Sequence, residues 1–167
     1  MELNPYSVIL FDWGDTVMKD DPSQGAPMVD WPQVEMVAGA DTLLEALHTH
    51  GRIIALATSA DVSNEAQIRG ALARVNLDQY FDKIFSFRNT GLQKSAAFYQ
   101  HVLDDLQVKP AKVLMIGDSF EKDVLAANLV GIAGVWFNPS TPETREGPAF
   151  VTAHSLAELL KRLQPFR

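Results

Sequence analysis

The chain has 167 residues, of which 47% are apolar and 21% charged, a composition typical of one globular domain with a sizeable core. Its formal net charge of −7, without a cluster of Lys and Arg, argues against nucleic acid or an anionic membrane as the main partner. Because it has no cysteines, disulfides, thiolate catalysis and cysteine-ligated zinc are excluded.

Strand-like and helix-like segments alternate along the chain. Short apolar runs predict strands at about 7–12, 52–58, 83–87, 112–117 and 133–137, with a short sixth near 150–152. Apolar residues at helical spacing predict helices over 41–50, 64–75 and around 98–106, and a last helix that begins at Ser155. This alternation is typical of a parallel sheet covered on both faces. We therefore predict an α/β fold, a three-layer Rossmann-like sandwich with a mainly parallel sheet of five or six strands.

Two stretches lack a regular period. Residues 18–32 and 138–149 contain several prolines and are expected to be surface loops. Neither has the composition of a linker between domains, so we expect a single domain over residues 1–167.

Three of the predicted strands end in polar or acidic residues. Asp12 follows the first apolar run, Thr58 and Ser59 follow the second, and Asp118 follows the fourth. A carboxylate at the end of a buried strand is costly unless a site uses it. Because ligands of open α/β sheets bind at the carboxyl ends of the strands, these residues indicate one shared site.

The same residues resemble the four motifs of the haloacid dehalogenase superfamily, in order and at compatible spacing. Residues 12–16, Asp-Trp-Gly-Asp-Thr, are similar to its first motif, Asp-x-Asp-x-Thr. Thr58 matches the second motif and Lys94 the third. Gly117-Asp118-Ser119 with Asp123 resembles the fourth, Gly-Asp-x-x-x-x-Asp. The resemblance covers nearly the whole chain and implies a hydrolase, most simply a phosphatase.

The resemblance also implies a division of roles. Asp12 is expected to be the nucleophile that forms an aspartyl-phosphate, assisted by Lys94 and Thr58. Thr58, Ser59 and Lys94 are expected to bind the phosphoryl oxygens, with Lys83 as an alternative lysine. Mg²⁺ is the expected cofactor, since it prefers oxygen ligands.

The expected magnesium ligands come from two strand ends. They are the carboxylates of Asp12 and Asp118 and the backbone carbonyl of Gly14. Asp123 is expected to bind directly or through water.

One position departs from the pattern. Gly14 stands where phosphatases of the superfamily carry a second Asp, which protonates the leaving group and then activates water. Loss of such a general acid and base costs on the order of 10²- to 10⁴-fold in rate. Asp15 is adjacent but one place out of register, so we predict a slow enzyme, or one restricted to good leaving groups.

The sequence is compatible with other functions. The alternative is a catalytically weakened domain that binds phosphate or a protein partner. Phosphonate or C–halogen hydrolysis is a third reading, disfavoured by the metal pair Asp118 and Asp123 and by the lack of room for a cap.

The segment between Thr16 and Gly51 leaves no room for a separate cap domain. We expect instead a short flexible loop, about 18–32, beside the site. The expected partner is a phosphorylated substrate, either a small molecule or a macromolecule, and the oligomeric state is unknown. With no basic, apolar leader at the start and no long apolar run, we expect a cytoplasmic protein that does not enter membranes.

Overall fold

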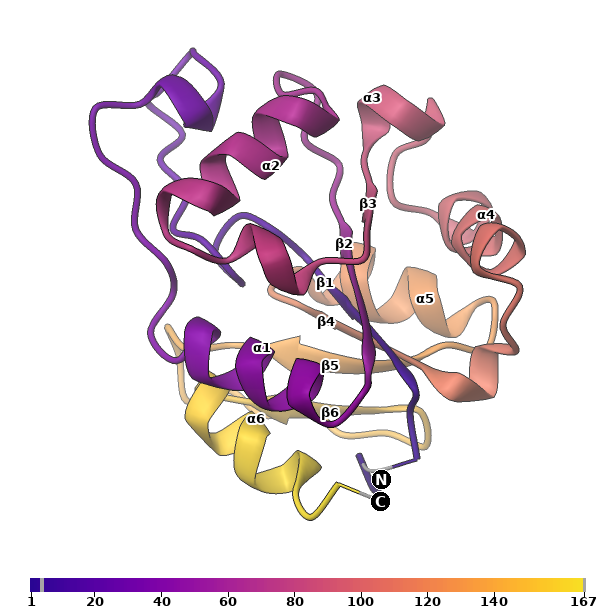
Figure 1. Cartoon of the computed structure of the whole chain (residues 1–167). Helices are drawn as coiled ribbons and strands as arrows, with labels where there is room; N and C mark the ends of the chain where they lie inside the picture. The colour runs from indigo at the N-terminus through magenta and orange to yellow at the C-terminus, as the bar shows by residue number, and fades with distance from the viewer. Residues whose placement is uncertain (4, 167) are drawn as a thin grey trace.

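The computed structural model describes residues 1–3 and 5–166 and shows a central sheet between two layers of helices (Figure 1). Six strands, all parallel, lie in the order β3-β2-β1-β4-β5-β6. They are β1 (Val8–Phe11), β2 (Ile53–Ala57), β3 (Lys83–Phe85), β4 (Val113–Gly117), β5 (Ala133–Phe137) and β6 (Phe150–Ala153). The prediction of an α/β sandwich with a Rossmann-like sheet is confirmed.

Four helices fall close to the predicted ranges: α1 (Ala40–Thr49), α2 (Glu65–Arg74), α4 (Ala96–Leu106) and α6 (Leu156–Leu163). The structure also has the short helices α3 (Phe87–Thr90) and α5 (Ala126–Asn128), which the sequence pattern did not predict. The strand predicted over 83–87 is shorter in the structure, because Ser86 begins α3. The Ser86 hydroxyl accepts a hydrogen bond from the backbone N–H of Asn89, and the Asn89 side chain accepts one from the N–H of Ser86.

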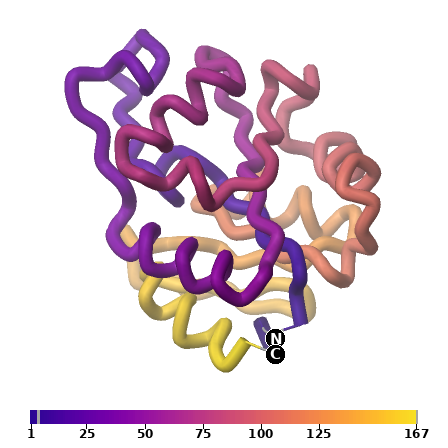
Figure 2. Tube along the Cα trace, viewed as in Figure 1, coloured from indigo at the N-terminus to yellow at the C-terminus, as the bar shows by residue number. Residues whose placement is uncertain are grey.

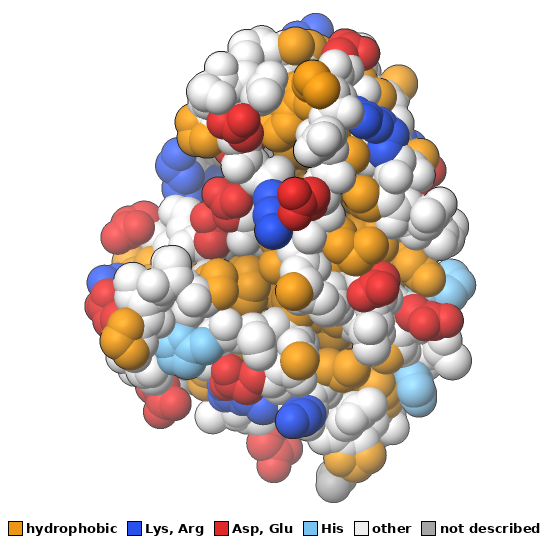
Figure 3. Space-filling model, turned by 90° about the vertical axis from the view of Figure 1, so that its left-hand side faces the viewer, with side chains coloured by type: hydrophobic (Ala, Val, Ile, Leu, Met, Phe, Trp, Pro, Cys, Tyr) orange, Lys and Arg blue, Asp and Glu red, His pale blue; other side chains and the backbone are white. Residues whose placement is uncertain are grey.

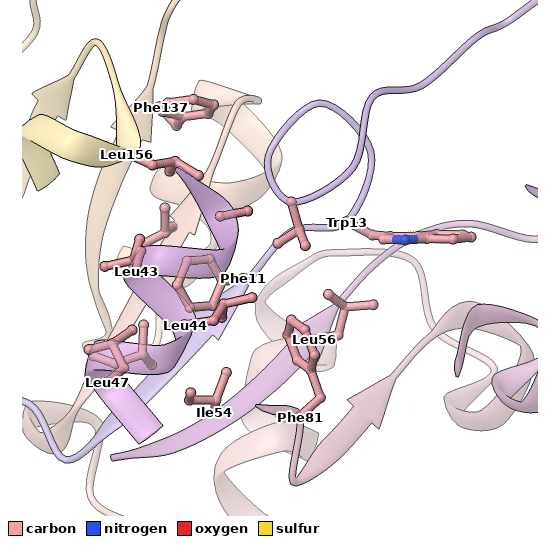
Figure 4. Close-up of a cluster of buried hydrophobic side chains, with 14 of the residues drawn as sticks. Phe11, Trp13, Leu43, Leu44, Leu47, Ile54, Leu56, Phe81, Phe137 and Leu156 are labelled. Carbon is pink, nitrogen blue, oxygen red and sulfur yellow. The ribbon is translucent and has the colours of Figure 1, made fainter. Parts of the chain in front are cut away.

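Strand β1 is buried on both faces of the sheet, which explains its uninterrupted apolar sequence. Val8 and Leu10 belong to the cluster that α4 and α5 complete. Ile9 and Phe11 belong to the opposite cluster, with side chains of α1, α2 and α6. Figure 4 shows Phe11 among the leucines of α1. By this alternation Asp12 is directed toward the side of α4 and α5.

The segment between β1 and α1 is long and runs along the outside of the molecule (Figure 2). It contains one short 3₁₀ turn, Met28–Asp30, and is held against α2 by Arg74. The Arg74 guanidinium donates hydrogen bonds to the backbone carbonyls of Val29 and Trp31, over 3.2 and 2.6 Å. This attachment places the segment beside the carboxyl ends of the strands.

The side of the molecule along which this segment runs carries acidic, basic and hydrophobic side chains interspersed (Figure 3). None of the helices formed by the described residues has the length and hydrophobicity needed to cross a bilayer.

Candidate active site

The ends of three neighbouring strands bring the predicted site residues together. Strands β2, β1 and β4 are adjacent and in register, with Phe11 opposite both Leu56 and Ile116. Asp12, Thr58 and Asp118 follow these strands at the same edge of the sheet. The backbone N–H of Asp12 donates to the carbonyl of Ile116 over 2.9 Å, so the hydrogen bonds of the sheet continue to Asp12 and fix the position of its backbone.

A buried lysine lies between two carboxylates at this edge. The Nζ atom of Lys94 donates to Asp12 Oδ1 over 2.5 Å and to Asp123 Oδ1 over 2.6 Å. The side chains of Lys94 and Asp123 are only 4% and 0% exposed. Burial lowers the pKa of Lys94, but the charges of Asp12 and Asp123 outweigh it and the pKa is raised, so the ammonium stays charged.

Hydrogen bonds of the backbone hold Lys94 in place just before α4. Its backbone N–H donates to the hydroxyl of Ser59 over 3.0 Å, which links the loop to the end of β2. Ser95 then begins α4 by accepting a hydrogen bond from the N–H of Phe98. Lys83, the alternative lysine, lies elsewhere and forms an ion pair with Asp105 at 2.7 Å.

The buried position of the Asp123 side chain depends on the glycine at the end of β4, Gly117. The Asp123 side chain accepts a hydrogen bond from the N–H of Ser119 at Oδ2, over 2.9 Å, within the π-helical turn Phe120–Leu125 and its cap. A Cβ atom on Gly117 would lie 2.2 Å from this Oδ2 atom, a distance that real contacts do not allow. Glycine at position 117 therefore makes room for the buried carboxylate.

Three carboxylates form a candidate metal site. One oxygen of each of Asp12, Asp118 and Asp123 lies within 4.8 Å of the others. The side chain of Asp118 is exposed, but partial desolvation, together with its neighbours Asp12 and Asp123, raises its pKa to about 8. Burial and the charge of Asp12 raise the pKa of Asp123 to about 6 despite Lys94. A divalent cation would relieve this repulsion, and a set made only of oxygen donors suits a hard cation such as Mg²⁺.

The acidic cluster opens into a pocket of about 400 Å³. Thr58, Ser59, Gly14, Asp12 and Lys94 all line it, so these predicted site residues share one cavity. Thr58 is buried, and its backbone N–H continues the sheet by donating to the carbonyl of Phe85 over 2.9 Å. Asp118 is not part of the lining and lies beside it.

The residues after Asp12 turn sharply, and Asp15 is not part of the pocket lining. Asp15 has a φ of 59°, and its carboxylate accepts a hydrogen bond from the N–H of Asp20 over 3.0 Å. The Asp20 side chain fills the space next to Gly14. A Cβ atom on Gly14 would lie 3.3 Å from the Cβ atom of Asp20 and 3.6 Å from its Oδ2 atom.

Several contacts of the site were not predicted. Thr16 donates from its hydroxyl to Asp118 Oδ1 over 3.5 Å, and the indole N–H of Trp136 donates to the carbonyl of Asp118 over 3.0 Å. Asp20 and Trp31 line the pocket. Thr16 ends the first motif, which was a usable signal; Asp20 and Trp31 are loop residues without one.

The chain matches the family model of haloacid dehalogenase-like hydrolases over residues 25–137, more than half of its length. It belongs to this family. The matched range includes Thr58, Lys94, Asp118 and Asp123 and begins after Asp12.

One curated relative is also similar to the chain in sequence. The chain is 30% identical, over 65% of its length, to a ribulose-1,5-bisphosphate 5-phosphatase from Halopiger xanaduensis, of which it covers 44%. It thus spans less than half of this curated relative.

Two solved structures share the fold. One is an uncharacterized protein from Listeria monocytogenes, with a TM-score of 0.80 and 24% identity over 94% of this chain and 96% of that one. The other is the HAD-hydrolase YfnB from Bacillus subtilis bound to magnesium, with a TM-score of 0.75 and 16% identity over 96% and 100%.

Proposed function

We propose that the protein is a Mg²⁺-dependent phosphohydrolase that acts through an aspartyl-phosphate on Asp12. The observation that carries the proposal is the buried Lys94, held against Asp12 and Asp123 at the carboxyl edge of the sheet. A strand-end carboxylate with a fixed cation beside it, inside a pocket, suits nucleophilic attack on an anionic phosphate.

The first half of the reaction uses Asp12, Lys94 and Thr58. A carboxylate oxygen of Asp12 forms a bond to phosphorus while the bond from phosphorus to the leaving oxygen breaks. Lys94 and the hydroxyl of Thr58 stabilise the negative charge on the phosphoryl oxygens. Ser59 contributes by holding the Lys94 backbone. Water then opens the acyl phosphate, releasing inorganic phosphate and restoring Asp12.

The carboxylates and the first-motif backbone are the proposed metal ligands. Asp12, Asp118 and the carbonyl of Gly14 would hold Mg²⁺ directly. Both oxygens of Asp123 already accept hydrogen bonds, from Lys94 and Ser119, which favours contact through water. When bound, the cation offsets the repulsion between the nucleophile and the phosphate.

Gly14 limits the rate in this proposal. It has no side chain to protonate the leaving group, and Asp15 does not line the pocket but accepts a hydrogen bond from the N–H of Asp20. The substrates that fit are therefore esters or anhydrides with good leaving groups, such as aryl or acyl phosphates. We also propose one catalytic domain without a cap, in which the segment 18–32 borders the site.

The experiment is a rapid acid quench during turnover of an aryl phosphate with Mg²⁺, followed by mass spectrometry. We expect phosphate on Asp12, and a loss of activity of about 10³-fold or more in Asp12→Asn. A chelator should abolish turnover of the wild type. Phosphate bound without turnover or labelling would favour the alternative, a catalytically weakened binding domain.

A further inference from the structure

Outside the reacting end, the mixed lining of the pocket includes three acidic side chains. Asp20 and Asp61 are exposed and Asp21 is half-buried, and all three belong to the lining. The lining has two lysines, Lys94 and Lys122. Lys94 is buried at the reacting end beside Asp12 and Asp123, so the outer part of the pocket carries three carboxylates against one ammonium group.

The same outer part has an apolar wall. Met28 and Trp31 of the segment between β1 and α1, together with Val62 after β2, line it. The indole N–H of Trp31 donates to the carbonyl of Ala26 over 2.8 Å, so its polar group is satisfied within the protein. A group beyond the phosphate therefore meets carbon surface and negative charge.

We propose that the substrate is a monophosphate whose leaving group is uncharged and partly apolar, and that the outer pocket discriminates against a second anionic group. This inference rests on the proposed function, because it takes the phosphate to lie at Asp12. The carboxylates of Asp20, Asp21 and Asp61 act as the selective element by like-charge repulsion. The apolar wall gives the affinity for the remainder of the leaving group.

The effect is large enough to measure. Like charges at pocket distances in a partly screened environment repel enough to weaken binding by on the order of tenfold. Salt should reduce the discrimination, since the Debye length is about 8 Å at physiological ionic strength.

The test uses phosphonates, which are not hydrolysed, so that binding is measured without turnover. Calorimetry with Mg²⁺ compares methylphosphonate, phenylphosphonate and 4-carboxyphenylphosphonate. We expect phenylphosphonate to bind on the order of tenfold more tightly than the carboxyphenyl compound. It should also bind more tightly than methylphosphonate, because of the apolar wall.

In the variant Asp21→Asn/Asp61→Asn, the difference in affinity between phenylphosphonate and 4-carboxyphenylphosphonate should narrow to within about threefold. Asn at position 21 keeps an acceptor for the N–H of Ser23, so the turn is preserved. The control Asp30→Asn/Glu45→Gln removes the same charge from exposed residues outside the lining and should leave the gap unchanged.

Equal or tighter binding of the carboxyphenyl ligand by the wild type would overturn the inference, as would equal narrowing of the gap by the control variant. The proposed function fails separately, if the enzyme hydrolyses no phosphate ester with Mg²⁺. In that event the ranking of the phosphonates still decides whether the outer pocket rejects a second anion.

Discussion

At the scale of single residues, Gly14 and Asp20 together define the leaving-group side of the site. Gly14 is not among the residues with a positive φ, so an Asp there meets no backbone strain. Its Cβ would nevertheless press on Asp20, and the two carboxylates would repel. We expect Gly14→Asp alone to hydrolyse alkyl phosphates little faster than the wild type. The double variant Gly14→Asp/Asp20→Ala should hydrolyse them about 10²-fold faster.

Control variants distinguish the effect of Gly14→Asp from proton donation by the neighbouring acids Asp15 and Asp20. Asp15→Asn should change nothing, because the Asp15 side chain faces the backbone of Asp20. The gain in the double variant should be smaller for aryl phosphates, whose leaving groups need little protonation. A strong loss on alkyl phosphates in Asp20→Ala alone would contradict this account, since Asp20 would then already supply the proton. Melting temperatures must be measured for each variant.

At the scale of elements, the end of β4 is built around the missing side chain of Gly117. Gly117→Ala should displace the buried Asp123 and with it the partner of Lys94. We expect a loss of stability of about 1–3 kcal/mol, typical of overpacking. We also expect an affinity for Mg²⁺ weaker by on the order of tenfold, by analogy with lost outer-shell contacts.

Gly25→Ala is the matched control for Gly117→Ala. A Cβ atom on Gly25 meets nothing within 4 Å, and the backbone there has no positive φ. Denaturation and calorimetry should therefore show no loss of stability or of Mg²⁺ affinity. The same Mg²⁺ affinity in Gly117→Ala and the wild type would show that Asp123 plays no part in the metal site.

How far the elements can be predicted depends on how local their causes are. The six strands follow from apolar runs, and Asp12, Thr58 and Asp118 meet because parallel strands end at one edge. The four-residue helix α3 is too short for a helical period and depends on the cap at Ser86. Trp31 lines the pocket in a segment whose backbone Arg74 holds from 43 positions further along the chain, and no local pattern encodes that contact.

At the scale of the whole molecule, the acidic cluster couples folding to pH. The pKa values of Asp118 and Asp123 are raised to about 8 and about 6, from an ordinary value of 3.8. At pH values between the ordinary pKa and the raised ones, these carboxylates bind more protons in the folded state than in the unfolded state. The stability of the metal-free protein therefore falls as pH rises through this range. The lowered pKa values of Asp21 and Glu35 change the pH dependence of stability only at more acidic pH. The raised pKa of Lys94 changes it only above the ordinary lysine value of 10.5.

Melting curves in chelator from about pH 5 to about pH 8 should therefore show a falling melting temperature. Mg²⁺ binds the ionised carboxylates, so the stabilisation that it adds should grow over the same range. Asp118→Asn removes the carboxylate whose pKa is raised furthest in this cluster, so it should reduce the fall of the melting temperature with pH in chelator. A melting temperature that rises with pH in chelator, or one that falls equally in Asp118→Asn, would mean that this cluster does not set the pH dependence of folding.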